Sequence, residues 1–217
     1  MPGKNIIPIM GKPLIAWTIE QALLCKCLDR IVVSTDDNEI AHISIRYGAE
    51  VPFVRPPELA TDNAKGIDVL LHTMDWVKKN EKMYDFVIYL QPTSPLRSSK
   101  DIISALLLMD EKKAKAIVSV CKIEHPPMWS NILPDDHSMI GFVKEDVVNK
   151  NRQDVDSYYR LNGAIYLACW NYIIENKSWF KEGSYAYVMP PERSVDIDTE
   201  TDSSFAEFLL RRKIAKQ

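Results

Sequence analysis

Residues 85–97 read D-F-V-I-Y-L-Q-P-T-S-P-L-R, and this stretch decides the fold class. Its first six residues form a short apolar run, which is typical of a strand buried in a core. Two prolines and several polar residues follow at once, so the strand ends in a rigid loop. Ser98 or Ser99 then caps a helix that continues to about Lys113. A strand, a polar loop and a helix in this order predict an α/β fold.

The same pattern recurs on both sides of this stretch. Apolar runs predict further strands at residues 30–35, 51–54, 116–120, 160–167, 186–189 and 194–197. Helical periodicity and caps predict helices at about residues 13–23, 36–47, 65–79, 170–176 and 201–212. Strands that alternate with helices predict a three-layer domain with a mostly parallel sheet and helices on both faces.

Residues 122–159 break this alternation. They are polar, contain three prolines and lack strong helical periodicity. We interpret them as an excursion from the main sheet, because a long irregular stretch in a compact domain is usually functional. The predicted organisation is an α/β domain made of residues 1–121 and 160–217, with an insertion at 122–159.

Composition excludes several classes of function. The 217 residues are 46% hydrophobic and 26% charged, as in ordinary globular proteins. A net charge of -3 gives no electrostatic case for nucleic acid or an acidic membrane as the main partner. The longest apolar run, at residues 102–109, is too short to span a bilayer. The four cysteines are scattered, so we interpret them as reduced thiols of a cytosolic protein rather than zinc ligands.

Residues 193–200 read R-S-V-D-I-D-T-E and contain a candidate metal site. In a strand, Asp196 and Asp198 point the same way, and the apolar residues between them point into the core. Neighbouring carboxylates repel unless a cation lies between them, and Mg²⁺ or Mn²⁺ is the simplest candidate. The alternative is that Asp198 caps the helix beginning near Thr201 and that Asp196 is solvated.

Three loops follow predicted strands, at residues 55–63, 91–97 and 196–199. In a doubly wound sheet such loops line one crevice. Besides the two carboxylates they carry Arg55, Gln91 and Arg97. Arginines bind anions, and carboxylates bind metal ions. Their presence in one crevice suggests phosphoryl or nucleotidyl transfer. The alternative is that Arg97 solvates a loop end and that Gln91 holds the proline-rich turn.

A series of short motifs runs from residue 2 almost to the end of the chain. They are P-G-K-N-I at 2–6, G-K-P-L-I-A-W-T-I at 11–19, V-V-S-T-D-D at 32–37, R-P-P-E-L-A-T-D at 55–62, L-Q-P-T-S-P-L-R at 90–97, R-Q-D at 152–154, R-L-N-G-A-I-Y at 160–166 and S-V-D-I-D-T-E at 194–200. On these motifs the chain resembles the CMP-sialic acid synthetases, the acylneuraminate cytidylyltransferase family.

The resemblance implies an enzyme with a nucleotide-diphospho-sugar transferase-like fold. The anomeric hydroxyl of an N-acylneuraminate-type nine-carbon sugar acid (sialic, legionaminic or pseudaminic acid) would attack the α-phosphate of CTP. The products would be the CMP-sugar and pyrophosphate, made in the cytoplasm for cell-surface polysaccharide biosynthesis. The resemblance also implies a homodimer whose extension at 122–159 carries Arg152 toward the partner's active site.

The resemblance also assigns roles to residues. Asp196 and Asp198 match the family's catalytic and metal-binding carboxylates, which take Mg²⁺ or Mn²⁺. Asp198 or a metal-bound hydroxide is the candidate general base. Lys4 and Asn5 match the end of the nucleotide-binding motif, and Arg55 matches a nucleotide contact. The positions that match sugar-binding residues are Gln91, Arg152, Arg160 and Tyr166.

The chain departs from the family at its start. The family opens with a buried strand and R-x-G-S-K-G-L-P-x-K-N, of which Pro2, Lys4 and Asn5 remain. Loss of that strand would leave two sheet edges and an open core face, so we expect a truncated form of a longer gene product. One alternative is a non-catalytic dimeric sugar-binding remnant. Another is a sugar nucleotidyltransferase with different base use, because residues 65–66 replace serines of the family.

Overall fold

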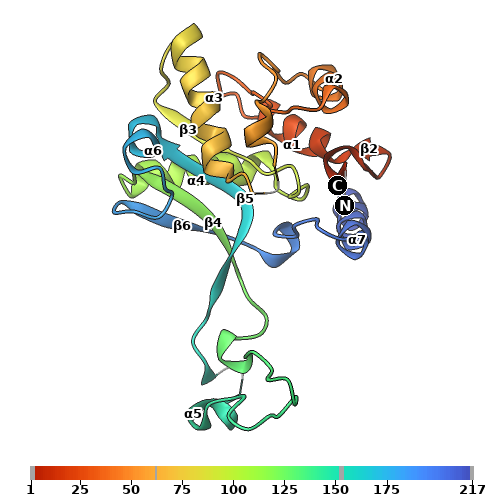
Figure 1. The fold of residues 1–217 in the computed structure, drawn as a ribbon, viewed down its shortest axis with the longest axis vertical. Helices are drawn as coiled ribbons and strands as arrows, with labels where there is room; N and C mark the ends of the chain where they lie inside the picture. The colour runs from red at the N-terminus through yellow and green to blue at the C-terminus, as the bar shows by residue number, and fades with distance from the viewer. Residues whose placement is uncertain (1–2, 62, 152–153, 216–217) are drawn as a thin grey trace.

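A four-stranded sheet lies at the centre of the structure, a computed structural model that describes residues 3–61, 63–151 and 154–215 (Figure 1). Its strands, in spatial order, are β3 (Phe86–Tyr89), β5 (Tyr159–Cys169), β4 (Ala116–Lys122) and β6 (Ser184–Met189). β5 is antiparallel to both of its neighbours, whereas β4 and β6 are parallel. Three strands therefore run one way and one runs the other, which confirms the mostly parallel sheet.

Helices cover both faces of this sheet. On one face, α4 (Ser99–Glu111) packs against apolar residues of β4, β5 and β6. On the other face, α3 (Gly66–Asn80) and α6 (Trp170–Asn176) form a second apolar cluster with the sheet. Each helix buries one apolar stripe, as the helical spacing of the sequence predicts. The three-layer α/β prediction is confirmed.

The remaining elements surround this core. They are β1 (Pro8–Ile9), β2 (Lys12–Pro13), α1 (Leu14–Leu23), α2 (Asn38–Arg46), α5 (Glu145–Val148), α7 (Glu200–Ile214) and the short 3-10 turns Lys4–Ile6, Pro57–Leu59, Pro127–Trp129 and Pro191–Arg193. Thr199 caps α7, and its side chain accepts the N–H of Asp202 while the Asp202 carboxylate accepts the Thr199 N–H. Asp198 is therefore not the helix cap, and that alternative is wrong. Within the described ranges, every helix is too short or too polar to cross a membrane.

Three predicted strands do not form regular strands. Residues 30–35 and 51–54 make only isolated parallel bridges, Val32 with Glu50 and Thr35 with Val54. Residues 194–197 also lie outside the strands of the sheet. The physical reason for the first pair is that a strand needs ladder partners, and residues 31–35 bond to the chain on one side alone.

β3 is also less buried than its sequence predicts. The run at residues 85–90 predicts a strand in the core, but β3 lies at the edge of the sheet. None of its residues is fully buried, and Phe86 is 48% exposed. Among the described residues, β3 has one strand neighbour, β5, which leaves its other side open.

A small lobe projects from the body between β4 and β5 (Figure 1). The last ladder pair is Lys122 with Tyr159, and the Ile123 N–H still donates to the Tyr158 carbonyl at 3.0 Å. Beyond this point the chain forms short turns and α5. The lobe occupies the stretch that the sequence predicts as an excursion, and its boundaries as a dimerisation unit stay a prediction.

Candidate active site

The two carboxylates lie beside the loop that follows β3. The Ile197 N–H donates to the Thr93 carbonyl at 2.9 Å, which joins the two segments. Ile197 is buried, and Val195 packs against the same apolar cluster, as alternation predicts. Although this segment is not a regular strand, it brings Asp196 to the end of the sheet where the loop at 91–97 begins. This is the edge at which open α/β sheets bind ligands.

Gly163 of β5 lets three segments meet at this edge. Its φ is +70°, a conformation that other residues rarely adopt. A Cβ built at Gly163 would lie 2.1 Å from Oε1 of Gln91 and 3.6 Å from Oδ2 of Asp196. Gln91 and Asp196 therefore both approach the backbone of β5 at a point where no side chain can stand. A glycine within a strand is the sequence signal of such a close approach.

The carboxylates differ in environment. Oδ1 of Asp196 is buried and has no hydrogen-bond partner among the described residues. The Asp198 side chain is 66% exposed, and its Oδ1 lies 2.8 Å from Nζ of Lys4. In the described part of the chain no third His, Cys, Asp or Glu completes a metal-binding group with them. The pair still fits Mg²⁺, which is usually held by one or two carboxylates and by substrate phosphates.

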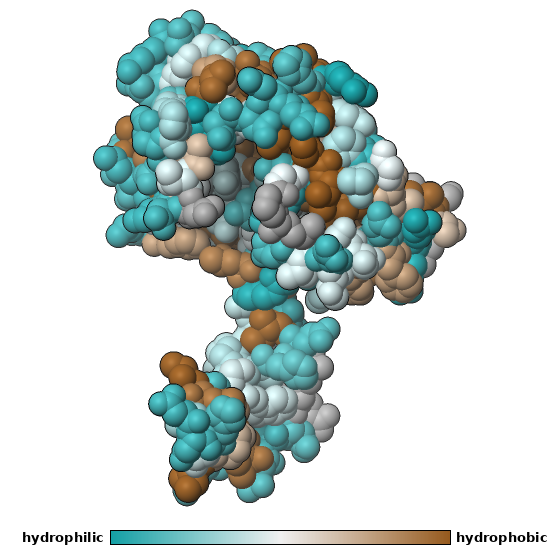
Figure 2. Space-filling view, turned by 45° about the vertical axis from the view of Figure 1, so that its right-hand side comes forward, coloured by the Kyte–Doolittle hydropathy of each residue, from teal (hydrophilic) through white to brown (hydrophobic). Residues whose placement is uncertain are grey.

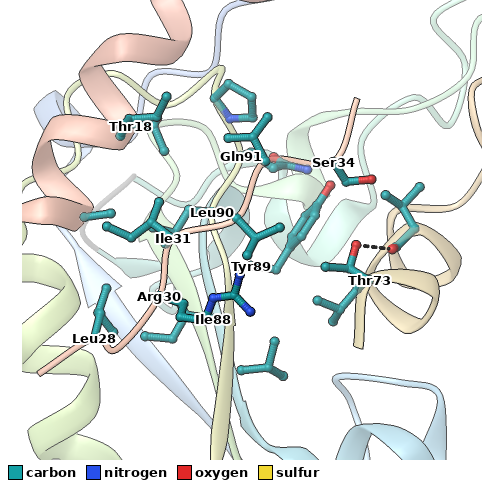
Figure 3. Close-up of a pocket in the computed structure, with 18 of the residues that line it drawn as sticks. Thr18, Leu28, Arg30, Ile31, Ser34, Thr73, Ile88, Tyr89, Leu90 and Gln91 are labelled. Atoms are coloured by element: carbon teal, nitrogen blue, oxygen red, sulfur yellow. Dashed lines mark hydrogen bonds between the residues drawn. The ribbon is translucent and has the colours of Figure 1, made fainter. Parts of the chain in front are cut away.

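The nucleotide candidates are among the residues that line a large cavity of about 710 Å³. Figure 3 shows other residues of its lining, among them Thr18, Tyr89 and Gln91. Lys4 and Asn5 line it, and Arg55 lines it from the loop after residue 54. The Arg55 guanidinium donates to Oδ1 of Asp36 at 2.6 Å, and this hydrogen bond lowers the pKa of the Asp36 carboxyl. The three predicted nucleotide residues are therefore brought together at this cavity.

Two of the predicted sugar residues line a second cavity of about 510 Å³, which Arg55 also borders. They are Gln91, which lines both cavities, and Tyr166. Burial raises the pKa of Tyr166, and the neighbouring Tyr89 and Asp196 raise it further. The Tyr166 ring lies 5.3 Å, centroid to centroid, from that of Trp179.

The sequence reasoning missed two aromatic residues of the second cavity. Trp179 and Phe180 line it from the loop after α6. Phe180 is 58% exposed, so it is a large apolar side chain on the surface beside a cavity. The adjacent pair W-F in a polar loop is the signal that could have found them, since exposed aromatic residues often mark binding sites.

Of the other two sugar candidates, only Arg160 lies among the described residues, and it is not placed at these cavities. The Arg160 guanidinium donates to the carbonyls of Ser194 at 2.9 Å and Leu161 at 3.2 Å, and Arg160 lines neither cavity. In this structure it supports the backbone just before Asp196. Arg152 lies outside the described residues, so its assignment stays a prediction.

Arg97 corrects the sequence reasoning. It is 1% exposed, and its guanidinium donates to the carbonyls of Ala164 at 2.6 Å and Gln91 at 3.1 Å and to Oγ1 of Thr18 at 2.6 Å. Burial lowers its pKa to about 10. Arg97 therefore neither binds an anion in the crevice nor solvates a loop end. Its hydrogen bonds fix the backbone of Gln91 against β5 and α1.

A buried polar network that the sequence did not indicate holds the segment before Asp196. Nδ2 of Asn162 donates to Oγ of Ser194 at 2.9 Å, and Oγ of Ser119 donates to Oδ1 of Asn162 at 2.6 Å. The Ser194 hydroxyl donates to the Pro190 carbonyl at 2.9 Å. Because buried polar groups need partners, this network favours one position for Ser194 relative to β4 and β5.

A partly buried ion pair, in which the carboxylate is the buried partner, anchors the start of the same segment. The Arg193 guanidinium donates to both oxygens of Asp101 in α4, at 3.0 and 2.8 Å. Burial alone would raise the pKa of Asp101, but hydrogen bonds from Arg193 and Ser98 outweigh it and lower the pKa. Arg193 and Ser194 are thus both held to the core by hydrogen bonds. Asp196 and Asp198 come shortly after these two fixed residues in the chain.

Comparison with known proteins links these features to one group of enzymes. Residues 1–164 match the family model described as Cytidylyltransferase. The CMP-N,N'-diacetyllegionaminic acid synthase of Legionella pneumophila is 36% identical, over 97% of this chain and 90% of that protein. A pseudaminic acid cytidylyltransferase of Campylobacter jejuni is 31% identical, over 97% of this chain and 90% of that protein. An Escherichia coli N-acylneuraminate cytidylyltransferase is 35% identical, over 97% of this chain and 49% of that protein.

Solved structures show the same fold at lower sequence identity. A CMP:2-keto-3-deoxy-manno-octonic acid synthetase complexed with CTP has a TM-score of 0.67 and 19% identity, over 98% of this chain and 93% of that one. A 4-diphosphocytidyl-2C-methyl-D-erythritol synthase from Anaerococcus prevotii has a TM-score of 0.64 and 18% identity, over 95% of this chain and 93% of that one. These likenesses bear on the fold alone.

Proposed function

The chain belongs to the cytidylyltransferase family, and we propose that it joins CMP from CTP to a nine-carbon sugar acid of the N-acylneuraminate type. The observation that carries this proposal is that Gln91, which lines both cavities, meets Asp196 at Gly163. Lys4 lines only the larger cavity, Trp179 and Phe180 line only the smaller one, and Arg55 lines both. This division suits an anionic nucleotide on one side and a sugar acid on the other.

The nucleotide side is supported by the cationic residues that line the larger cavity. Lys4 lies next to Asp198, and Arg55 lines both cavities. Arginine and lysine side chains bind phosphates through charge-assisted hydrogen bonds. We assign Lys4, Asn5 and Arg55 to CTP, with Lys4 leaving Asp198 to contact the phosphates.

The sugar side is supported by the groups around the smaller cavity. The amide of Gln91 can both donate to and accept from sugar hydroxyl and acylamino groups. The hydroxyl of Tyr166 and the rings of Trp179 and Phe180 offer one polar group and apolar surface beside it. Because Gln91 lines both cavities, a sugar bound to it would present its reacting end to the nucleotide.

In the proposed reaction a bond forms between the anomeric oxygen and the α-phosphorus of CTP. The bond from that phosphorus to the pyrophosphate oxygen breaks, and the hydroxyl loses its proton, for which the Asp198 carboxylate is the candidate acceptor. The protein contributes mainly position and charge, with Gln91 orienting the sugar and Lys4 facing the phosphates. Asp196 and Asp198 would hold Mg²⁺ or Mn²⁺, and such an ion, when bound, offsets negative charge on the phosphates.

A panel of substrates tests this proposal. The purified chain is incubated with MgCl₂, each of the four ribonucleoside triphosphates, and sialic, legionaminic or pseudaminic acid. We expect pyrophosphate release with CTP and at least one of these acids, and only background release without the acid. Release with another nucleotide but not with CTP, or binding of a sugar acid with no use of any nucleotide, would overturn the proposal.

We also propose that the projecting lobe pairs with a second copy of the chain. Its surface carries large apolar side chains, of which Ile132 is 90% exposed and Ile140 is 96% exposed. Figure 2 shows apolar atoms on the surface of this lobe at the foot of the molecule. Exposed apolar patches on a projecting element are typical of protein interfaces. A second copy of this chain is the partner that fits the lobe best, because the lobes of two copies can contact each other in a two-fold dimer.

Replacement of Ile140 by Asp is expected to convert the dimer to a monomer, because a charge would then be buried at the interface. Analytical ultracentrifugation of both chains measures this change. Leu107→Asp is the matched control, since Leu107 is 66% exposed on α4, in the body of the molecule. A wild-type chain that stays monomeric, or a control that dissociates as well, would contradict the assignment.

A further inference from the structure

Tyr89, the last residue of β3, lies at the boundary between the two cavities. Four of the described residues line both cavities, and they are Arg55, Val69, Tyr89 and Gln91. Figure 3 shows the hydroxyl of Tyr89 directed toward the part of the larger cavity where the side chain of Gln91 lies. A polar group at this boundary can contact the substrates on both sides of it, and the proposed function assigns no role to Tyr89.

Gly66, the first residue of α3, leaves space for this hydroxyl. A Cβ built at Gly66 would lie 3.0 Å from Oη of Tyr89 and 3.4 Å from its Cζ. The backbone of Gly66 is not in the left-handed region, so its conformation does not require glycine. A larger residue at this position would press on the phenol. Gly66 therefore contributes the space at this point, and Tyr89 contributes the hydroxyl.

The Tyr89 hydroxyl is a hydrogen-bond donor that the protein does not use. Within the described part of the chain it has no hydrogen-bond partner. Burial raises the pKa of Tyr89, and the nearby Arg55 guanidinium opposes this rise without reversing it. The phenol is therefore protonated at neutral pH. A partly buried donor without a protein partner favours a ligand group that accepts a hydrogen bond.

The other polar side chains near this boundary have different tasks. The Arg55 guanidinium donates to Oδ1 of Asp36 at 2.6 Å, and we assign Arg55 to CTP. Gln91 is assigned to the hydroxyl and acylamino groups of the sugar. Tyr166 also carries a hydroxyl, but it lines only the smaller cavity. Tyr89 is thus the donor available to a sugar group that lies close to the nucleotide.

The carboxylate of the sugar acid is the group that reaches this boundary. In a nine-carbon sugar acid of this type, one carbon, the anomeric carbon, carries both the attacking hydroxyl and the carboxylate. A sugar that lies in the smaller cavity with its anomeric oxygen toward the nucleotide therefore places its carboxylate at the boundary. Gln91 and Asp196 approach each other there, at Gly163. The Asp196 carboxylate would repel that of the sugar, so a donor for the sugar carboxylate is needed.

We propose that the Tyr89 hydroxyl donates to the carboxylate of the sugar acid and so selects an acid over a neutral sugar. This inference rests on the proposed function and names the residue that recognises the acid group. A hydroxyl that donates to a carboxylate forms a charge-assisted hydrogen bond, which is stronger than one between neutral groups. Tyr89 is therefore a specificity-determining residue.

Tyr89→Phe tests this inference, because it removes the hydroxyl and keeps the ring. Calorimetry measures the binding of sialic, legionaminic or pseudaminic acid and of the primary amide of the same acid, which has a similar size without the charge. We expect the wild-type chain to prefer the acid by about tenfold or more, and Tyr89→Phe to lose most of this preference while its KM for CTP is unchanged. Tyr84→Phe is the matched control, because Tyr84 lines only the larger cavity, and it should keep the preference.

Gly66→Ala tests the geometry separately. Its Cβ should displace the Tyr89 hydroxyl, so this variant should also lose the preference for the acid. In the Tyr89→Phe background, Gly66→Ala should have no further effect on that preference, because the two changes remove the same contact. Alanine suits a helix better than glycine, so the thermal unfolding temperature should not fall.

The outcomes separate this inference from the proposed function. A preference for the acid that survives in Tyr89→Phe, that Tyr84→Phe loses as well, or that the wild-type chain lacks would overturn the inference while the proposed function stands. A raised KM for CTP in Tyr89→Phe with an unchanged preference would also overturn it and would assign the hydroxyl to the nucleotide. A wild-type chain that binds no acid and releases no pyrophosphate would overturn the proposed function and the inference with it.

Discussion

Replacement of Asp198 by Asn is expected to lower CMP-sugar formation by about a hundredfold or more while the fold is retained. The side chain is 66% exposed and does not cap α7, so its charge contributes little to packing. Loss of the charge should also weaken Mn²⁺ binding in the presence of CTP, measured by calorimetry. Asp196→Asn should have an effect at least as large, because its buried Oδ1 has no partner among the described residues.

A matched control separates this role from the loss of a surface ion pair. Asp110 pairs with Lys113 at 3.0 Å, much as Asp198 pairs with Lys4 at 2.8 Å, but it lies at the far end of α4. Asp110→Asn should leave turnover and Mn²⁺ binding unchanged, because exposed pairs contribute little. Near-normal turnover and metal binding in Asp198→Asn would refute the role assigned to this carboxylate.

Gly163→Ala is the second substitution with a large expected effect. A Cβ at this position would lie 2.1 Å from Oε1 of Gln91, so the amide must move. Gln91 lies between the two cavities, and a displacement of about 1 Å at a positioned reactant can cost about a hundredfold in rate. We therefore expect kcat/KM to fall by about that factor, measured by pyrophosphate release at limiting sugar acid.

Gly11→Ala is the control for backbone strain. Gly11 has a φ of +76°, close to the +70° of Gly163, and a Cβ there would have nothing within 4 Å. Both variants should lose about 1–2 kcal/mol of stability from the left-handed backbone, measured by thermal unfolding. Only Gly163→Ala should lose activity. An equal loss of activity in both would show that strain, not the position of Gln91, is the cause.

The sequence predicts the helices and the central strands of this fold well, because their periodicity comes from local burial. The helix predicted at 65–79 is α3, and the one predicted at 170–176 is α6. The runs at 30–35 and 85–90 are also apolar, but whether they become inner strands depends on a neighbour on each side. The periodicity of apolar residues indicates that a segment can be buried in a core. It does not indicate which neighbouring strand the segment pairs with.

The sequence predicted those site residues whose chemical role is indicated by a motif. It did not predict those whose position depends on tertiary packing. Asp196 and Gln91 come together as the motifs indicate, and Gly163 explains how. Arg97 was expected in the crevice because arginine binds anions, but its guanidinium is used inside the core. The adjacent W-F pair at residues 179–180 is visible in the sequence, but only the structure shows that this loop after α6 lines a cavity.

The central claim is that this chain makes a CMP-sugar, and ³¹P NMR of a single reaction mixture tests it most directly. The mixture holds the chain, CTP, MgCl₂ and N,N'-diacetyllegionaminic, sialic or pseudaminic acid in turn. The account predicts that, with at least one acid, the triphosphate signals of CTP are replaced by a phosphodiester signal and a pyrophosphate signal. The two products form in equal molar amounts, so the pyrophosphate signal, which comes from two phosphorus atoms, has twice the area of the phosphodiester signal. CTP that binds but stays unchanged with every acid, or that yields free CMP without a phosphodiester, would contradict it.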